Sequence, residues 1–127
     1  MKVEIVPATR DDIITAMLEL YGEVRDIPLR VMAFAGRYGN RVLGVGGVAF
    51  YPNGARVAFC DVGDEGRKHK IALHKAALMT IEAAKAMKVR TLLVTTDGMH
   101  DKTPAWLLRL GFEPKFFEGR AVYVREL

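Results

Sequence analysis

The sequence predicts an α/β (α+β) fold in which a mixed, mostly antiparallel sheet of six to seven strands carries helices on both faces, in the order β-α-β-β-β-α-β-α-β-β. Short β-rich runs separated by turns rich in Gly, Asn and Pro fill much of the first half of the chain. A long Ala-rich segment, typical of a helix, then precedes a nearly continuous apolar run, typical of a strand buried on both faces. These observations indicate a meander followed by a parallel crossover.

The N-terminal part of the chain predicts a strand followed by an amphipathic helix. Residues 2–6 are β-rich, and Thr9 is a suitable N-cap for a helix that Gly22 ends. Residues 23–30 form a polar connector. The apolar residues at helical spacing, which we expect to face the sheet, are Ile13, Ile14, Met17, Leu18 and Tyr21.

Three strands of a meander follow. They are expected at residues 30–37, 42–51 and 55–62, with turns at 38–41 and 52–54. The middle strand contains Gly44, Gly46 and Gly47. Glycines inside a strand mark a bulge or a close approach by another backbone or a ligand.

The second half of the chain predicts the crossover and a terminal hairpin. We expect a helix from Arg67 to Met87, with Ile71, Ala77, Leu78, Ile81 and Ala84 facing the sheet, and a buried strand at residues 89–96. A short helix is expected with Thr103 as its N-cap, Pro104 at its first position and Gly111 at its end. The hairpin strands are expected at residues 112–117 and 121–125.

The composition is that of an ordinary globular domain. Residues 1–127 are enough for one domain with one core, and no apolar run approaches the roughly 20 residues of a membrane span. The start of the chain lacks the apolar run of a signal peptide. The single cysteine, Cys60, is expected in a buried strand and has no internal disulfide partner. We therefore expect a cytoplasmic protein without a membrane partner.

A basic turn before the long helix is the most unusual feature of the sequence. Residues 67–70 are Arg, Lys, His and Lys. Cations at the positive end of a helix lose roughly 0.3–1 kcal/mol each, and a bound phosphate offsets that loss. A solvated turn, partly neutralised by Asp64 and Glu65, explains the same residues. Both interpretations stay open.

Two segments resemble the GNAT family of N-acetyltransferases. The stretch VGDEGRKHKIA, residues 62–72, is similar to the family's coenzyme A pyrophosphate loop, Val-x-Pro-x-x-Arg/Gln-x-x-Gly-x-Gly/Ala. It departs from that pattern at Asp64, where the family often has proline, and at Lys70, where it has its first glycine. The stretch WLLRLGFEP, residues 106–114, resembles the later signature, a helix ending in Leu-Gly-Phe-Glu. The resemblance covers nearly the whole chain.

The resemblance implies the GNAT, or acyl-CoA N-acyltransferase, fold, with the family's second helix missing or reduced. It also implies acetyl-CoA as co-substrate, without a metal, bound where two parallel strands separate. Loop and helix N-terminus would hold the pyrophosphate, and pantetheine would pair with a strand edge. The cofactor-binding residues implied are Cys60, Val62, Arg67, Lys68, His69, Lys70, Ile71, Ala72 and Asp97. Turn capping explains Asp97 equally well, and His69 is either a phosphate contact or an exposed residue.

Acyl transfer to an amine needs a base, a donor to the oxyanion and an acid for the leaving thiolate. Asp61 is the candidate base, although a surface carboxylate paired with Arg56 or Arg67 explains it equally well. The backbone N–H of Val62 is the candidate oxyanion donor. In the family a tyrosine commonly supplies the acid, and Leu107 stands at that position here.

We therefore expect a protein that transfers an acyl group from acetyl-CoA to a primary amine by direct attack, with the acceptor unidentified. The alternative is a catalytically inactive GNAT-like protein that acts as a binding or assembly module. The loop without its first glycine, the missing tyrosine and the short connector motivate this alternative. A homodimer through the last strands is a further expectation. A third, weaker hypothesis is that the basic turn contacts a nucleic acid. The net charge of +4 is small for that role.

Overall fold

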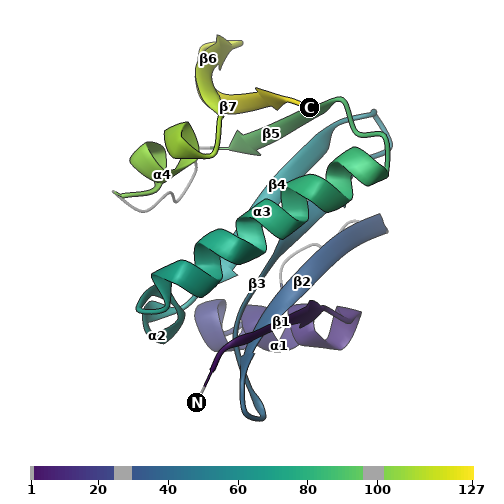
Figure 1. The fold of residues 1–127 in the computed structure, drawn as a ribbon. Coiled ribbons are helices and arrows are strands. Elements are labelled where there is room, and N and C mark those ends of the chain that lie inside the picture. Colours follow the sequence, from purple (N-terminus) through teal and green to yellow (C-terminus); the bar gives the residue numbers. More distant parts are fainter. Residues whose placement is uncertain (1, 25–29, 96–101) are drawn as a thin grey trace.

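The computed structural model describes residues 2–24, 30–95 and 102–127 and contains a seven-stranded sheet (Figure 1). The strands are β1 (Glu4–Pro7), β2 (Arg30–Tyr38), β3 (Arg41–Phe50), β4 (Arg56–Val62), β5 (Thr91–Thr95), β6 (Glu113–Phe117) and β7 (Arg120–Glu126). The helices are α1 (Arg10–Tyr21), α2 (Asp64–Arg67), α3 (Lys70–Ala86) and α4 (Thr103–Arg109).

The sheet is mixed and mostly antiparallel, which confirms the predicted fold class. Its order is β1-β2-β3-β4-β5-β7-β6. All neighbouring strands pair antiparallel except β4 and β5, which pair in parallel and are joined through α3. The described helices follow the predicted order, with the short helix α2 as an addition. None of the helices in the described ranges is long and apolar enough to cross a membrane.

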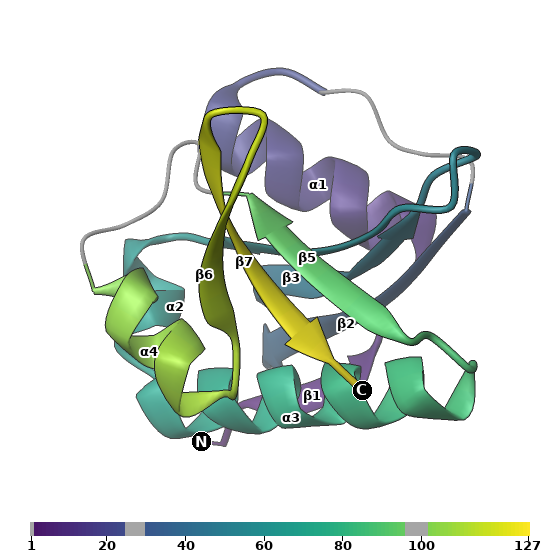
Figure 2. The same cartoon turned by 90° about the horizontal axis from the view of Figure 1, so that it is seen from above.

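Helices cover both faces of the sheet (Figure 2). On one face, α1 packs on β2 and β3 through a cluster formed by Ile13, Ala16, Met17, Ala33, Ala35 and Val45. On the other face, α3 and α4 share a larger cluster, which includes Val48, Phe50, Ile81, Ala84, Leu92, Leu107, Leu110 and Phe112. Neighbouring positions of β3 therefore feed opposite cores, as the alternation of side chains along a strand requires.

The predicted close approach in the glycine-rich strand occurs at Gly47. A Cβ added there would lie 2.0 Å from the carbonyl oxygen of Met32 on β2. The register of β2 and β3 is regular at this point and shifts instead between Gly36 and Arg37. Gly47 therefore lets the two strands pair without displacing the β2 backbone.

Helix α1 begins and ends as predicted, but its buried face is narrower. Thr9 is the N-cap, and Gly22 takes the left-handed conformation, with φ of 71°, at the C-cap. Ile13 and Met17 are buried, whereas Leu18 is 49% exposed and Tyr21 is exposed as well. The buried face of α1 is formed by Asp12, Ile13, Ala16 and Met17, and Leu18 lies at its solvent-facing border.

The prediction of one helix from Arg67 to Met87 is wrong at its start. One helical turn, α2, follows β4, and α3 begins only at Lys70, with His69 as its N-cap. Ile81 and Ala84 face the sheet as expected, and Ala77 packs against the same core. Ile71 and Leu78 are exposed instead. Helix α3 therefore packs on the sheet through Ala77, Ile81 and Ala84, whereas Ile71 and Leu78 point outward.

Smaller differences lie at the other predicted boundaries. Lys102, and not Thr103, is the N-cap of α4, and no side chain caps that helix. Its C-cap is Leu110, followed by Gly111 with φ of 90°. The predicted connector falls largely on residues 25–29, which lie outside the described residues.

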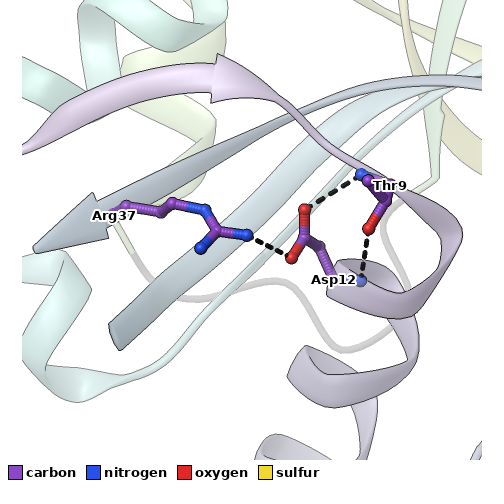
Figure 3. A network of polar contacts seen from close by, with 3 residues as sticks. All are labelled: Thr9, Asp12 and Arg37. Carbon is purple, nitrogen blue, oxygen red and sulfur yellow. Dashed lines mark hydrogen bonds and ion pairs between the residues drawn. The ribbon is translucent and has the colours of Figure 1, made fainter. Parts of the chain in front are cut away.

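A partly buried polar network fixes the start of α1 (Figure 3). The N–H of Thr9 donates to Asp12 Oδ2 at 2.9 Å, and the N–H of Asp12 donates to Thr9 Oγ1 at 3.1 Å. Arg37 on β2 donates to Asp12 Oδ1 at 2.6 Å. Asp12 is 8% exposed. The network ties the first turn of α1 to the sheet.

We expect Asp12→Asn to lower the free energy of unfolding by about 1–2 kcal/mol at pH 7, because the amide loses the charge-assisted bonds. The pKa of Asp12 is lowered, chiefly by the backbone hydrogen bond from Thr9 and also by Arg37, while desolvation opposes the shift. Such a carboxyl stabilises the fold above its unfolded pKa of about 4, and this contribution is lost as the pH falls through the lower folded pKa. Urea unfolding at pH 7 and at about pH 3 measures the effect, and the difference from wild type should shrink at the lower pH.

The matched control is Asp11→Asn, which makes the same charge change at an exposed position of the same turn. It should lose only about 0.3–1 kcal/mol, from the weaker interaction with the helix dipole. Equal losses in the two variants, or an Asp12→Asn difference that persists undiminished at low pH, would contradict the stabilising role of the network.

Candidate functional site

The candidate site lies where β4 separates from β5. The two strands have a paired position at Val57 and Leu93, and no described residue of β5 pairs with β4 beyond it. On its other side, β4 stays paired with β3 along its whole length, from Arg56 to Val62. Among the described residues, the last residues of β4 therefore have a sheet partner on one side only.

The glycines of β3 reveal which backbone groups of β4 face the open side. A Cβ added to Gly44 would lie 2.9 Å from the carbonyl oxygen of Asp61, and one added to Gly46 would lie 3.1 Å from that of Phe59. These two carbonyls therefore face β3. Because successive residues of a strand direct their N–H and C=O groups to opposite edges, the N–H groups of Cys60 and Val62 point away from β3.

The loop after β4 uses its own backbone donors. The N–H groups of Arg67, Lys68 and His69 donate to the carbonyls of Gly63, Glu65 and Gly66, at 3.0, 3.2 and 3.0 Å. These amides are engaged within α2 and the turn that follows it. Of the predicted pyrophosphate contacts, Arg67, Lys68 and His69 can thus meet a ligand through their side chains.

The N-terminus of α3 offers free backbone donors. The first hydrogen bond of the helix runs from the N–H of Leu73 to the carbonyl of His69, so the amides of Lys70, Ile71 and Ala72 have no partner within the helix. No side chain caps this end, and its first turn contains no acidic residue. Three N–H groups and the positive end of the helix dipole therefore lie next to exposed cations, which is an arrangement suited to an anion.

Two contacts with the β2–β3 hairpin hold the loop in place. The ring of His69 lies against that of Tyr38, with centroids 5.8 Å apart. Arg41 forms an ion pair with Glu65 at 2.5 Å, and both side chains are about half exposed or more. Water screens such a pair, which contributes at most about 1 kcal/mol. Glu65 thus neutralises Arg41 on the hairpin rather than the basic residues beside it.

The underside of the loop is closely packed around Gly66, which is buried. A Cβ added to Gly66 would lie 2.5 Å from Val62 Cγ1 and 2.7 Å from the carbonyl oxygen of Leu43. A larger residue would therefore push α2 away from the end of β4. This glycine sets the distance between the loop and the strand.

Cys60 is exposed, so the prediction of a buried cysteine is wrong. The strand itself was predicted correctly, but β5 does not cover this part of it. Desolvation and then the Asp61 carboxylate raise the pKa of the Cys60 thiol, while Arg67 lowers it. Because solvent reaches Cys60, screening limits the size of the shift.

Asp61 lies on the α1 face of the sheet. It stands opposite Val45, which is buried beneath α1, and it follows Phe59, which packs on the same cluster. Tyr21, the last residue of α1, donates its hydroxyl to Asp61 Oδ1 at 2.5 Å. Neither Arg56 nor Arg67 appears as an ion-pair partner of Asp61 among the described residues. Sequence reasoning missed Tyr21, because its spacing placed it with the core residues of α1.

A pocket of about 390 Å³ adjoins the loop on the α1 face. It lies between α1, the beginning of β3 and α2. It offers space for a small molecule beside the end of β4. Its lining residues are Ala16, Glu19, Leu20, Arg41, Val42, Leu43, Gly44, Gly63, Asp64, Glu65 and Gly66.

The remaining site predictions have different outcomes. Leu107 is 4% exposed and belongs to the core, so that position offers no acid. Trp106 belongs to the same region and donates its Nε1–H to His74 Nδ1 at 3.0 Å, which ties α4 to α3. Asp97 lies outside the described residues. Within the described part of the chain, His, Cys, Asp and Glu side chains form no group of three or more that could hold a metal ion.

The fold that surrounds this site is the acyl-CoA N-acyltransferase, or GNAT, fold. The chain resembles a GNAT family acetyltransferase from Staphylococcus aureus with a TM-score of 0.73 and 14% identity, over 99% of both chains. An acetyltransferase from Bacillus subtilis in complex with CoA matches with a TM-score of 0.69 and 15% identity over 99% of both chains. A GNAT family acetyltransferase from Elizabethkingia anophelis with acetyl-CoA bound matches with a TM-score of 0.65 and 14% identity over 98% of both chains. No family model and no curated protein matches the sequence.

We expect Gly66→Ala to displace the loop, because the new methyl group would meet Val62 and the Leu43 carbonyl. For acetyl-CoA, the ligand that the sequence resemblance implies, this displacement should raise the Kd about tenfold or more. Gly36→Ala is the control, since a Cβ there would lie 3.7 Å from Val3, an ordinary contact distance. Calorimetric titration with acetyl-CoA, together with a thermal unfolding curve for each variant, measures both effects. Equal affinities for the two folded variants would mean that the position of α2 does not control the site.

Proposed function

We propose that this protein binds acetyl-CoA, or a related acyl-CoA, at the open edge of β4 and transfers the acyl group to a primary amine. The observation that carries this proposal is the meeting of two features. One is the edge of β4 that no described residue pairs with, which presents the N–H groups of Cys60 and Val62. The other is the basic N-terminus of α3, which no side chain caps and which follows β4 and α2 in the chain. Acetyl-CoA has two matching parts. Its extended pantetheine arm would lie along the strand edge, and its pyrophosphate would bind at the helix N-terminus.

The residues of the site fit such a molecule. The amides of Lys70, Ile71 and Ala72 would donate to pyrophosphate oxygens, and Arg67 and Lys68 would supply charge. Two proteins of the same fold carry CoA or acetyl-CoA in their structures, which supports the same class of ligand here. Acetyl-CoA supplies an activated thioester, and the protein's task is to orient it and to manage protons.

The chemical roles proposed from the sequence fall on neighbouring residues. The N–H of Val62 would donate to the oxygen that gains negative charge during attack. The Asp61 carboxylate, on the adjacent residue, would accept a proton from the incoming ammonium. The two groups point in different directions, Asp61 to the α1 face and Val62 to the strand edge. The amine would therefore approach from the α1 side.

One set of observations favours the alternative, a protein that binds an acyl-CoA without transferring its acyl group. Leu107 is buried where the resemblance calls for a tyrosine. The loop also bonds three of its amides internally, which leaves fewer backbone donors for the pyrophosphate. Binding without product formation in the presence of amines would support this alternative. Product formation would support the transferase.

We expect Arg67→Ala to raise the Kd for acetyl-CoA about tenfold, or roughly 1.4 kcal/mol, because a cation beside the anion site is lost. Lys115→Ala is the matched control, since Lys115 is an exposed cation on β6. Titration calorimetry at low ionic strength compares the two variants with wild type. Failure of the wild-type protein to bind acetyl-CoA at millimolar concentration would overturn the proposed function.

Lys70 allows a second test, because it stands where the resembled loop has glycine. Lys70→Ala removes the charge but keeps the Cβ, whereas Lys70→Gly removes both. We expect both variants to raise the Kd for acetyl-CoA about three- to tenfold, because the exposed ammonium contributes charge to the site. Tighter binding by Lys70→Gly alone would show that the Cβ obstructs the pyrophosphate.

A further inference from the structure

We infer that Tyr21 is a positioning residue for acyl transfer, which holds the Asp61 carboxylate in the orientation that receives the ammonium of the acceptor. This inference rests on the proposed function and adds to it a residue from α1, 40 positions away in the sequence from the residue it orients. It also states the class of acceptor, a primary ammonium that approaches from the α1 face.

The geometry of the pair is that of a phenol and a carboxylate. The Tyr21 hydroxyl lies 2.5 Å from Asp61 Oδ1. This is the length expected when an O–H group donates to an ionised oxygen. A donor at Oδ1 fixes the plane of the carboxylate and leaves lone pairs of Oδ2 for another donor. A protonated amine is such a donor.

Both residues of the pair belong to regular secondary structure. Tyr21 ends α1, and the N–H of Gly22 closes the helix by donating to the carbonyl of Leu18 at 3.0 Å. Asp61 belongs to the regular β3–β4 ladder, opposite Val45. The hydrogen bond therefore joins two fixed elements and restricts the rotation of the Asp61 side chain.

The pair is accessible from solution. Tyr21 is 38% exposed, and Asp61 is only partly buried. A bond at this position contributes little to stability compared with a buried one, so stability alone gives a weak account of it. The next residue, Val62, directs its N–H to the open edge of β4. A molecule that reaches Asp61 from the α1 side thus comes within one residue of the proposed thioester position.

The protons and bonds balance with these groups. The acceptor arrives as an ammonium and gives one proton to Asp61. Its freed electron pair forms the C–N bond at the thioester carbonyl carbon, and the C–S bond breaks. The second nitrogen proton goes to the leaving sulfur, and Asp61 returns its proton to solvent. One ammonium and one thioester therefore yield one amide, one thiol and one proton. Tyr21 keeps its own proton throughout.

The test compares Tyr21→Phe with Tyr51→Phe. Tyr51 is an exposed tyrosine at the turn between β3 and β4, at the opposite end of β4 from Asp61. The measurements are acetyl-CoA titration and initial rates with ethylamine, butane-1,4-diamine and 2-phenylethylamine as acceptors. For Tyr21→Phe we expect an unchanged Kd for acetyl-CoA and a fall of about 10- to 100-fold in kcat/KM for the amine, mostly in kcat. Tyr51→Phe should resemble wild type.

A double-variant cycle separates positioning from a general structural role. If Tyr21 acts through Asp61, then Tyr21→Phe should cost nothing further in a protein that already carries Asp61→Asn. A loss that persists in that background, or wild-type kinetics for Tyr21→Phe, overturns the role of Tyr21 and leaves the proposed function standing. Absence of acetyl-CoA binding, or binding without turnover of any of the three amines, overturns the transferase activity and the role of Tyr21 together.

Discussion

The incomplete pairing of β4 with β5 is the constraint on which the rest of the site depends. The β3 ladder holds β4 along its full length, while β5 is bound to β7 and buried through Leu92. Two parallel strands that are each held by a different antiparallel partner separate once their shared position at Val57 and Leu93 is passed. As a result β4, an inner strand of the sheet, has one edge that no described residue pairs with near its C-terminal end. An edge of this kind carries backbone groups that need water or a ligand.

The loop after β4 connects this edge to the basic N-terminus of α3. Because α2 uses its own amides and packs on Val62 and Leu43 through Gly66, it has a defined position before any ligand arrives. The contacts of His69 with Tyr38 and of Glu65 with Arg41 attach it further to the hairpin. A preformed loop loses little conformational entropy on binding. The basic residues 67–70, which are one cluster in the sequence, therefore belong to two parts of the structure. Arg67, Lys68 and His69 lie in α2 and the turn after it, and Lys70 begins α3.

Much of this architecture could be predicted from local signals. Thr9 and Gly22 mark the two ends of α1, and the turn residues mark the strands, because capping and turn chemistry act over a few residues. The break before Lys70 could not be found in this way, since nothing in the residue pattern interrupts the helix there. The pairing of Tyr21 with Asp61 depends on where the end of α1 lies over β4. The place of α1 over β4 follows from the order of the strands in the sheet. The spacing of apolar residues along one helix does not report that order. The resemblance to the GNAT loop selected residues 62–72 as the candidate site, but a sequence pattern does not report the hydrogen bonds within that loop.

The exposed thiol of Cys60 has a chemical consequence for a site of this kind. A cysteine beside a thioester invites self-acylation, in which the acyl group passes to the protein and blocks the next turnover. That exchange requires the thiolate, since the neutral thiol is a poor nucleophile. Desolvation, and then the charge of the Asp61 carboxylate, raise the pKa of the Cys60 thiol and so disfavour the thiolate, although screening by solvent limits the shift. In the proposed transferase, both effects would slow self-acylation at the strand edge.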